Sequence, residues 1–186
     1  VSGQPITKYC NEHRLSIKQR LTLFADVCKA VQHAHNKGVI HRDLTPNNIL
    51  VSTSEDGSPR AQIIDFGISR KTDEETADVM GTLMYMSPEQ TMGQQLDFRS
   101  DLYSLGCVLY ELVSGEPPFM ADDPIGVLMK HVGEPPPDLP SVLSDGQPPS
   151  EGLVALYKSL MAKKRINRPS KTTVVVEVFD ALSRAA

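Results

Sequence analysis

Two carboxylates and one amide stand in short segments that could together perform phosphoryl transfer. Residues 41–48 read H-R-D-L-T-P-N-N, and seventeen residues after Asn48 the chain reads D-F-G, beginning at Asp65. Phosphoryl transfer needs little covalent help from a protein, because the work reduces to aligning a hydroxyl and neutralising charge on the phosphate oxygens. The two segments supply one base and two oxygen ligands for a metal ion.

These segments match, in order, the catalytic loop H-R-D-L-x-x-x-N and the metal-binding turn D-F-G of protein kinases. The chain therefore resembles a protein kinase. The resemblance implies that Asp43 accepts or orients the substrate hydroxyl proton, that Asp65 binds Mg²⁺ at the ATP phosphates, and that Asn48 completes the second metal site. It also places Leu50 on the floor of the adenine pocket and makes ATP and Mg²⁺ the expected cofactors.

Neighbouring residues receive structural roles by the same resemblance. His41 is expected to stack on the ring of Phe66 rather than to act as an acid or base, and buried neutral histidines are common. Residues 81–89 read G-T-L-M-Y-M-S-P-E and resemble the peptide-docking segment that ends in A-P-E in most kinases. Ser87, in the alanine position, also predicts a helix start on local grounds, because Pro88 follows it and a glutamine stands at the capping-box position.

A long apolar helix is expected to begin near Arg99, to continue through Val113 and to end at Gly115. In kinases the equivalent helix is the central post of the large lobe, and its leading aspartate holds the backbone of the catalytic loop. Asp101 takes that position. A carboxylate in the first turn would also suit the helix dipole in any fold.

Two further residues are expected to form an ion pair. Arg168 directly precedes Pro169 and matches the arginine that pairs with the glutamate of the A-P-E motif, here Glu89. Such a pair is expected to be structural and not catalytic.

Two threonines bear on the rate and on the acceptor. Thr45 stands two residues after Asp43, where most Ser/Thr kinases have a lysine that contacts the γ-phosphate. Loss of one donor to transition-state charge costs on the order of 3 kcal/mol, so a slower enzyme is expected. Tyrosine kinases also lack this lysine, but Thr82, ahead of the P-E pair, is a Ser/Thr-kinase feature. Serine and threonine hydroxyls of proteins are therefore the expected acceptors.

A phosphorylated activation loop is expected between the D-F-G turn and the peptide-docking segment over 81–89. Arg42 directly precedes the catalytic aspartate, and kinases with that arginine commonly use a loop phosphate as its counter-ion. Arg70 matches a second basic residue that contacts the loop phosphate in this family. Thr76 is the first candidate phosphosite and Thr72 the second. The alternative is that Thr76 is a solvated loop threonine and that nearby acidic residues supply part of the negative charge.

The composition is that of an acidic chain of moderate size. Its 186 residues, 40% of them hydrophobic, suit one domain over residues 1–186, which would bury about 70% of the unfolded chain's surface. Nineteen basic and 23 acidic residues give a net charge of -4, which does not favour nucleic-acid binding. Three widely spaced cysteines indicate neither a disulfide framework nor a zinc site and fit a cytoplasmic location. No signal start or long apolar span is seen, so any membrane anchor is expected outside this chain.

The elements that must position these residues are mostly helical, so the expected fold is mainly α with short β-hairpins, an α+β arrangement. Ser16 and Gln19 form a capping box before an apolar pattern of helical spacing that ends at Gly38. Residues 49–51 and 61–64 are expected to pair as short strands. The other expected elements are a helix over 4–12, a helix from Pro124, an irregular stretch over 133–150 and two closing helices that include 174–176.

His33 and His35 form an H-x-H pair within the helix expected before Gly38. Residues two apart on a helix face different directions and cannot chelate one ion. Both are therefore expected to be ordinary helix residues.

Three parts of a complete kinase domain have no match in these 186 residues: the Gly-rich loop, the strand lysine and its partner glutamate. The chain therefore resembles the large lobe alone, with the hinge near residues 1–3 and the small N-terminal lobe as a missing partner. One reading is a serine/threonine-kinase lobe of the bacterial type that is inactive until joined to its small lobe. The other is a noncatalytic, pseudokinase-like lobe that binds proteins. Retention of Asp43, Asn48 and Asp65 together favours the first, because poised carboxylates repel each other without a metal.

Overall fold

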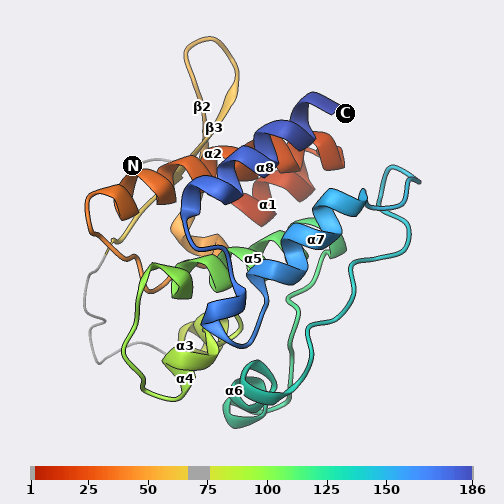
Figure 1. Cartoon of the computed structure of the whole chain (residues 1–186). Coiled ribbons are helices and arrows are strands. Elements are labelled where there is room, and N and C mark those ends of the chain that lie inside the picture. The colour runs from red at the N-terminus through yellow and green to blue at the C-terminus, as the bar shows by residue number, and fades with distance from the viewer. Residues whose placement is uncertain (1–2, 67–75, 186) are drawn as a thin grey trace.

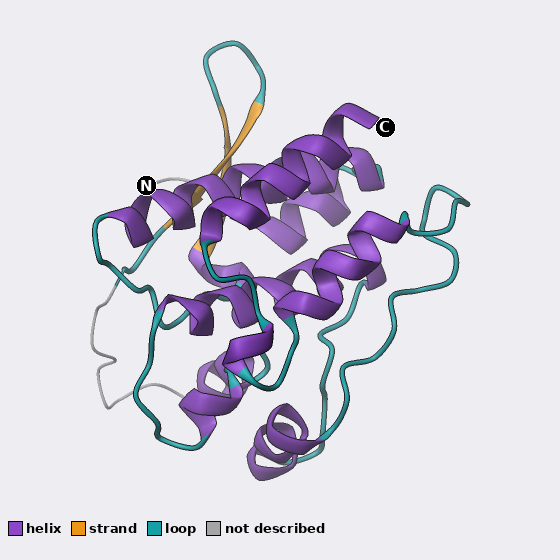
Figure 2. Cartoon of the chain, in the orientation of Figure 1, coloured by secondary structure: helices purple, strands orange, loops and turns teal. Residues whose placement is uncertain are grey.

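The computed structural model describes residues 3–66 and 76–185 (Figure 1). Its elements are β1 (Gln4–Pro5), α1 (Ile6–Glu12), α2 (Ile17–Asn36), η1 (Pro46–Asn48), β2 (Ile49–Thr53), β3 (Pro59–Ile63), α3 (Thr76–Leu83), α4 (Pro88–Thr91), α5 (Phe98–Ser114), α6 (Pro124–Gly133), α7 (Glu151–Leu160), η2 (Arg165–Asn167) and α8 (Thr172–Ala185), where η marks a short 3-10 helix. Helices dominate the described residues, and the strands form one small sheet (Figure 2). The prediction of a mainly helical chain with short paired strands is therefore confirmed.

The long helix α2 has clear sequence signals at both ends. Ser16 Oγ accepts a hydrogen bond from the backbone N–H of Gln19, and the Gln19 side chain accepts one from the Ser16 N–H, which completes the predicted capping box. After the helix, Gly38 has a φ of 74°, a left-handed conformation that glycine adopts without a side-chain clash. Helix α2 packs along α8, where Phe24 meets Phe179 edge-on with ring centroids 5.0 Å apart. The chain thus leaves this helix pair directly into the H-R-D segment.

The strands form an antiparallel sheet in the order β1-β2-β3. In the central pair, Ile49 lies opposite Ile63 and Thr53 lies opposite Pro59, so the predicted strand pair is present. The connecting turn contains Gly57 at a φ of 80°. This hairpin projects away from the helices (Figure 2).

The first helix begins later than predicted. Gln4 and Pro5 form β1, where Pro5 pairs with Leu50, and α1 starts only at Ile6. The prediction of a helix over 4–12 was therefore wrong for its first two residues. Pro5 is extended, with a ψ of 138°, and Gln4 directly precedes a proline, which disfavours the helical conformation at Gln4.

Helix α5 runs through the middle of the helices and is buried along most of its length (Figure 1). Every residue from 100 to 109 is buried, as expected for a helix that is apolar on nearly all sides. The helix ends at Gly115, whose φ is 92°. At Gly106, an added Cβ would lie 2.9 Å from Met161 Sδ and 3.0 Å from Leu160 Cβ. The glycine therefore permits the close approach of α7 to α5.

The last third of the chain follows the predicted pattern of helices and irregular segments. Asp123 accepts a hydrogen bond from the N–H of Gly126 and caps α6, which lies at one end of the molecule (Figure 1). Residues 134–150, all of them described, form no helix or strand, and α7 and α8 follow. Within residues 3–66 and 76–185, no helix combines the length and the apolar character needed to cross a membrane.

The segment just before the peptide-docking motif is helical, although a loop was expected there. Helix α3 begins at Thr76 and continues to Leu83. Neither glycine nor proline occurs between Thr76 and Met80, and alanine and methionine favour helices. The reading of Thr76 as a loop residue is thus corrected, while Thr72 and Arg70 lie outside the described residues.

Candidate active site

The loop with the H-R-D motif, residues 41–48, connects the end of α2 to the start of β2. Pro46 takes the first position of η1, where its missing N–H is not needed. The Asn48 N–H donates to the carbonyl of Thr45 at 3.0 Å and closes this turn. The loop is therefore held between two regular elements, the setting in which functional side chains usually occur.

A carboxylate from α5 holds the backbone at the start of the loop. Asp101 Oδ2 accepts the N–H of His41 at 2.8 Å, and Oδ1 accepts the N–H of Arg42 at 2.9 Å. Asp101 is 1% exposed, so these charge-assisted bonds form away from water. Arg42 has a φ of 72°, a left-handed conformation that costs energy in a residue with a side chain. Asp101 thus fixes the peptide groups on both sides of His41.

The His41 side chain ties the loop to the end of β3. Its Nε2 donates to the carbonyl of Ile64 at 2.8 Å, and its Nδ1 accepts the N–H of Asp43 at 3.2 Å. These two contacts require the neutral tautomer with hydrogen on Nε2. The ring also meets that of Phe66 edge to face, with centroids 4.7 Å apart. Both ring nitrogens of His41 are therefore engaged by the fold.

Asn48 links the H-R-D loop to the residues before the D-F-G turn. Its Nδ2 donates to the Asp43 carbonyl at 2.7 Å and lies 3.2 Å from Asp43 Oδ2. Its own carbonyl accepts the N–H of Ile64, the residue before Asp65, at 3.0 Å. Asp65 has a φ of 60°, and strained backbone of this kind clusters at functional sites. The structure thus brings together the segments that carry Asp43, Asn48 and Asp65.

The donor atoms at this place suit a hard divalent cation. Since Asn48 Nδ2 is engaged with Asp43, the amide oxygen is the atom left to ligate a cation, and Asp65 adds a carboxylate. Among residues 3–66 and 76–185, no group of three or more His, Cys, Asp or Glu side chains is arranged to hold a metal by itself. Mg²⁺ commonly binds one or two protein ligands together with waters and phosphate oxygens. The residues therefore fit Mg²⁺ that is shared with a nucleotide.

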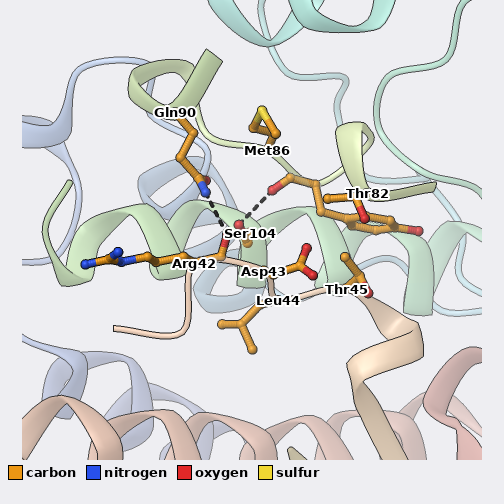
Figure 3. A pocket seen from close by; sticks show the side chains of 9 residues that line it. Arg42, Asp43, Leu44, Thr45, Thr82, Met86, Gln90 and Ser104 are labelled. Atoms are coloured by element: carbon orange, nitrogen blue, oxygen red, sulfur yellow. Dashed lines mark hydrogen bonds between the residues drawn. The ribbon is translucent and has the colours of Figure 1, made fainter. Parts of the chain in front are cut away.

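A small hollow opens beside Asp43 (Figure 3). Its lining residues are Arg42, Asp43, Leu44, Thr45, Thr82, Tyr85, Met86, Gln90 and Ser104. The Asp43 carboxylate points to the side of the hollow where Thr45 and Thr82 lie. Ser104 Oγ, on α5, donates to the carbonyl of Tyr85 at 2.7 Å and anchors the segment predicted to dock peptides. The predicted base and the predicted docking segment thus face the same space.

Glu89 and Arg168 meet in a buried ion pair. Arg168 Nη1 lies 2.6 Å from Glu89 Oε1, and Nη2 lies 2.9 Å from Oε2, with the two side chains 0% and 2% exposed. Ser100 Oγ adds a hydrogen bond to Glu89 Oε1 at 2.7 Å. Burial by itself would raise the pKa of Glu89, but the bonds from Arg168 and Ser100 hold that pKa below its usual value. The pair joins the start of α4 to the segment that follows α7.

Comparison with known proteins identifies the family. The family model of the protein kinase domain matches residues 1–179. The chain belongs to the protein kinase domain family. Serine/threonine-protein kinase PknB of Mycobacterium tuberculosis is 41% identical over 163 residues, which is 84% of this chain and 25% of that protein. A probable serine/threonine-protein kinase of Corynebacterium efficiens is 38% identical over 178 residues, which is 92% of this chain and 26% of that protein. The chain thus spans about a quarter of the length of these curated relatives.

Two other predicted site residues of this kinase domain, Leu50 and Thr82, lie in β2 and α3. Leu50 is half-buried in β2, opposite Gln62 of β3 and Pro5 of β1. Thr82 lies in the last turn of α3 and lines the hollow beside Asp43.

Sequence reasoning missed one buried residue of this kinase domain. His35 was expected to be an ordinary helix residue, yet its Nε2 lies 2.7 Å from Asp101 Oδ2 and its Nδ1 lies 2.7 Å from Thr172 Oγ1. Only 6% of its side chain is exposed. The available signal was its place four residues after the buried Val31, because a histidine that continues a buried stripe needs polar partners.

Proposed function

We propose that this chain is the catalytic large lobe of an ATP-dependent protein serine/threonine kinase. The observation that carries the proposal is the double link from Asn48, to Asp43 on one side and to Ile64, next to Asp65, on the other. It puts a candidate base and two candidate metal ligands within one small region. The similarity to bacterial serine/threonine-protein kinases supports the same assignment.

Asp43 would accept the proton of the substrate hydroxyl as that oxygen attacks the γ-phosphate. Its peptide is already held, because its N–H bonds His41 and its carbonyl bonds Asn48. The carboxylate therefore extends from a fixed backbone into the hollow. Asn48 and Asp65 would hold Mg²⁺, which supplies neutralisation of the phosphate charge when bound.

The proposed acceptors are serine and threonine hydroxyls of proteins. Thr82 faces the hollow from the peptide-docking segment, beside the catalytic loop. Thr45 lines the same hollow and is 6% exposed, so a neutral hydroxyl occupies the place where the family usually presents a lysine. We infer a slower transfer than in relatives with that lysine, because one charged donor to the phosphate is absent.

The proposed enzyme also requires a second, smaller lobe that lies outside this chain. It would supply the Gly-rich loop and the phosphate-contacting lysine, which the 186 residues lack. An apolar hollow beside the catalytic loop supports this view: Ala30, Ala34, Val39, Ile63 and Phe66 line it, together with His33 and Lys37. Val39 is 40% exposed there. Apolar surface of this kind commonly marks contact with another part of a protein.

A cytoplasmic location fits the same function. The three cysteines, Cys10, Cys28 and Cys107, are buried free thiols, and ATP-dependent transfer needs a nucleotide supply. Burial raises the pKa of all three thiols, which keeps them protonated and unreactive.

The second candidate function is a noncatalytic lobe that binds other proteins. Thr45 in place of lysine and the lack of a phosphate-binding loop in this chain favour it. Retention of both candidate metal ligands and of Asp43 favours the enzyme.

Phosphate transfer by the full-length gene product distinguishes the two. The protein is incubated with γ-labelled ATP, Mg²⁺ and a library of serine, threonine and tyrosine peptides. We expect label on serine or threonine, and a loss of about a hundredfold or more in rate for Asp43→Asn. Asp122→Asn, at an exposed carboxylate outside the hollow, is the matched control and should keep the wild-type rate. No transfer by the wild-type protein would leave the noncatalytic reading, and equal transfer by Asp43→Asn would overturn the assignment of Asp43 as the base.

A further inference from the structure

Gln90 does more than cap the short helix α4. Its Oε1 accepts hydrogen bonds from the Ser87 N–H at 3.0 Å and from Ser87 Oγ at 2.9 Å, while its own N–H donates to Ser87 Oγ at 3.3 Å. These bonds use the side-chain oxygen and the backbone. The side-chain nitrogen remains, and it donates to the carbonyl of Arg42 at 2.7 Å (Figure 3). One amide therefore joins the peptide-docking segment to the catalytic loop.

The carbonyl that Gln90 binds belongs to the peptide group between Arg42 and Asp43. The nitrogen of the same peptide group donates to His41 Nδ1 at 3.2 Å. The preceding peptide group is held at its N–H by Asp101. The left-handed φ of Arg42, 72°, is the rotation between these two held groups. Because this conformation is unfavourable for arginine, it persists only while its neighbours are restrained.

We propose that Gln90 is a positioning residue, which transmits the arrangement of the peptide-docking segment to the Asp43 carboxylate through the Arg42 carbonyl. This rests on the proposed kinase function. Asp43 directly follows the held peptide group, so the direction of its carboxylate depends on that group's orientation. A bound peptide or a phosphate that orders or displaces the docking segment would therefore change the direction of the Asp43 carboxylate through this one hydrogen bond.

Capping and positioning make different demands on this side chain. A capping box needs only an acceptor at this position, and glutamate serves as well as glutamine. The bond to Arg42 needs a donor, which a glutamate carboxylate lacks. Gln90→Glu therefore keeps the cap and removes the donor, whereas Gln90→Met removes both without adding charge.

The test compares Gln90→Glu, Gln90→Met and wild type in the full-length gene product, with Gln94→Glu as control. Gln94 is exposed and lies four residues further along the chain, so this variant adds the same charge nearby. Three quantities are measured: kcat and KM for peptide phosphorylation, the melting temperature, and hydrogen–deuterium exchange of the backbone over residues 41–46. Exchange reports on the loop whether or not the protein transfers phosphate.

We expect Gln90→Glu and Gln90→Met each to lower kcat about tenfold or more, since small misplacements of a catalytic group are costly. KM for ATP should stay within about twofold, and exchange over 41–46 should accelerate in both variants. Gln90→Glu and Gln94→Glu should keep the wild-type melting temperature. If backbone exchange over 41–46 in Gln90→Glu and Gln90→Met is as slow as in wild type, the proposal is overturned, even where kcat is reduced. If the wild-type protein itself transfers no phosphate, the proposed function fails, but the exchange result still decides the coupling.

Discussion

His35 Nε2 lies 2.7 Å from Asp101 Oδ2, the same oxygen that accepts the backbone N–H of His41. On its other side, His35 Nδ1 contacts Thr172 Oγ1 at 2.7 Å, at the first residue of α8. The carboxylate that holds the H-R-D loop is therefore itself held by α2, and α2 by the start of α8. The loop is coupled in this way to the C-terminal helix.

Removing the His35 bonds should destabilise the fold. His35→Leu keeps most of the side-chain volume but leaves Asp101 and Thr172 each without one partner, so the free energy of unfolding should fall by about 1–3 kcal/mol. Urea denaturation measures the change. His33→Leu, at an exposed position of the same helix, should stay within about 0.5 kcal/mol of wild type. Equal losses in both variants would contradict a specific role of His35.

The Glu89–Arg168 pair should make the fold sensitive to acid. The folded-state pKa of Glu89 lies below its usual value, because the bonds from Arg168 and Ser100 outweigh the effect of burial. The pair therefore contributes its full stability above the unfolded pKa of about 4.3 and loses it as the pH falls through the folded pKa. Glu89→Gln should cost about 3–5 kcal/mol at pH 7, since it leaves Arg168 buried without its counter-ion.

Urea unfolding between about pH 3 and pH 7 tests this prediction, because carboxylates titrate within this range. The acid-dependent loss of stability should be smaller in Glu89→Gln than in wild type. Glu134→Gln is the matched control, because Glu134 is 52% exposed and its ion pair with Lys130, at 3.8 Å, lies at the surface. If both variants lose stability with acid as steeply as wild type does, the pair is not the source.

Restoring a cation beside Asp43 should speed the reaction. Thr45→Lys would add a charged donor in the hollow, and kcat should rise by about tenfold through stabilisation of the transferred phosphate. Thr45→Met, of similar length without charge, should give no gain. Steady-state kinetics of the full-length protein measure both. A gain in Thr45→Met as well would mean that side-chain volume, not charge, limits the rate.

Autophosphorylation should occur at Thr76 or Thr72. Thr76 begins α3, and a phosphate at a helix N-terminus is stabilised by the dipole. Arg42 is exposed on the H-R-D loop, and we expect it to pair with that phosphate. Peptide mass mapping after incubation with ATP and Mg²⁺ should find the modification in wild type and not in Asp43→Asn. Two unmodified threonines in an active sample would rule out both sites.

Local signals in the sequence were enough to predict several elements. The Ser16–Gln19 and Ser87–Gln90 capping boxes and the final Gly115 have the predicted geometry, because each depends on residues within one turn. The assignment of Asp43, Asn48 and Asp65 came from motif resemblance, since no local rule places them together.

Contacts between distant residues could not be predicted in the same way. His35 meets partners 66 and 137 positions away, and Gln90 meets Arg42 48 positions earlier. The extended Pro5 likewise depends on β2, far along the chain. Such contacts arise from packing, and periodicity in one segment carries no information about them.

The distance in sequence between His41 and Asp101, 60 positions, has a consequence for synthesis. A ribosome that adds about 5–20 residues per second makes the H-R-D segment roughly 3–12 s before the carboxylate that holds it. A nascent chain that has not yet released α5 therefore carries the complete motif without its backbone restraint. The loop gains this restraint only after α5 has left the exit tunnel, while α6, α7 and α8 have still to follow.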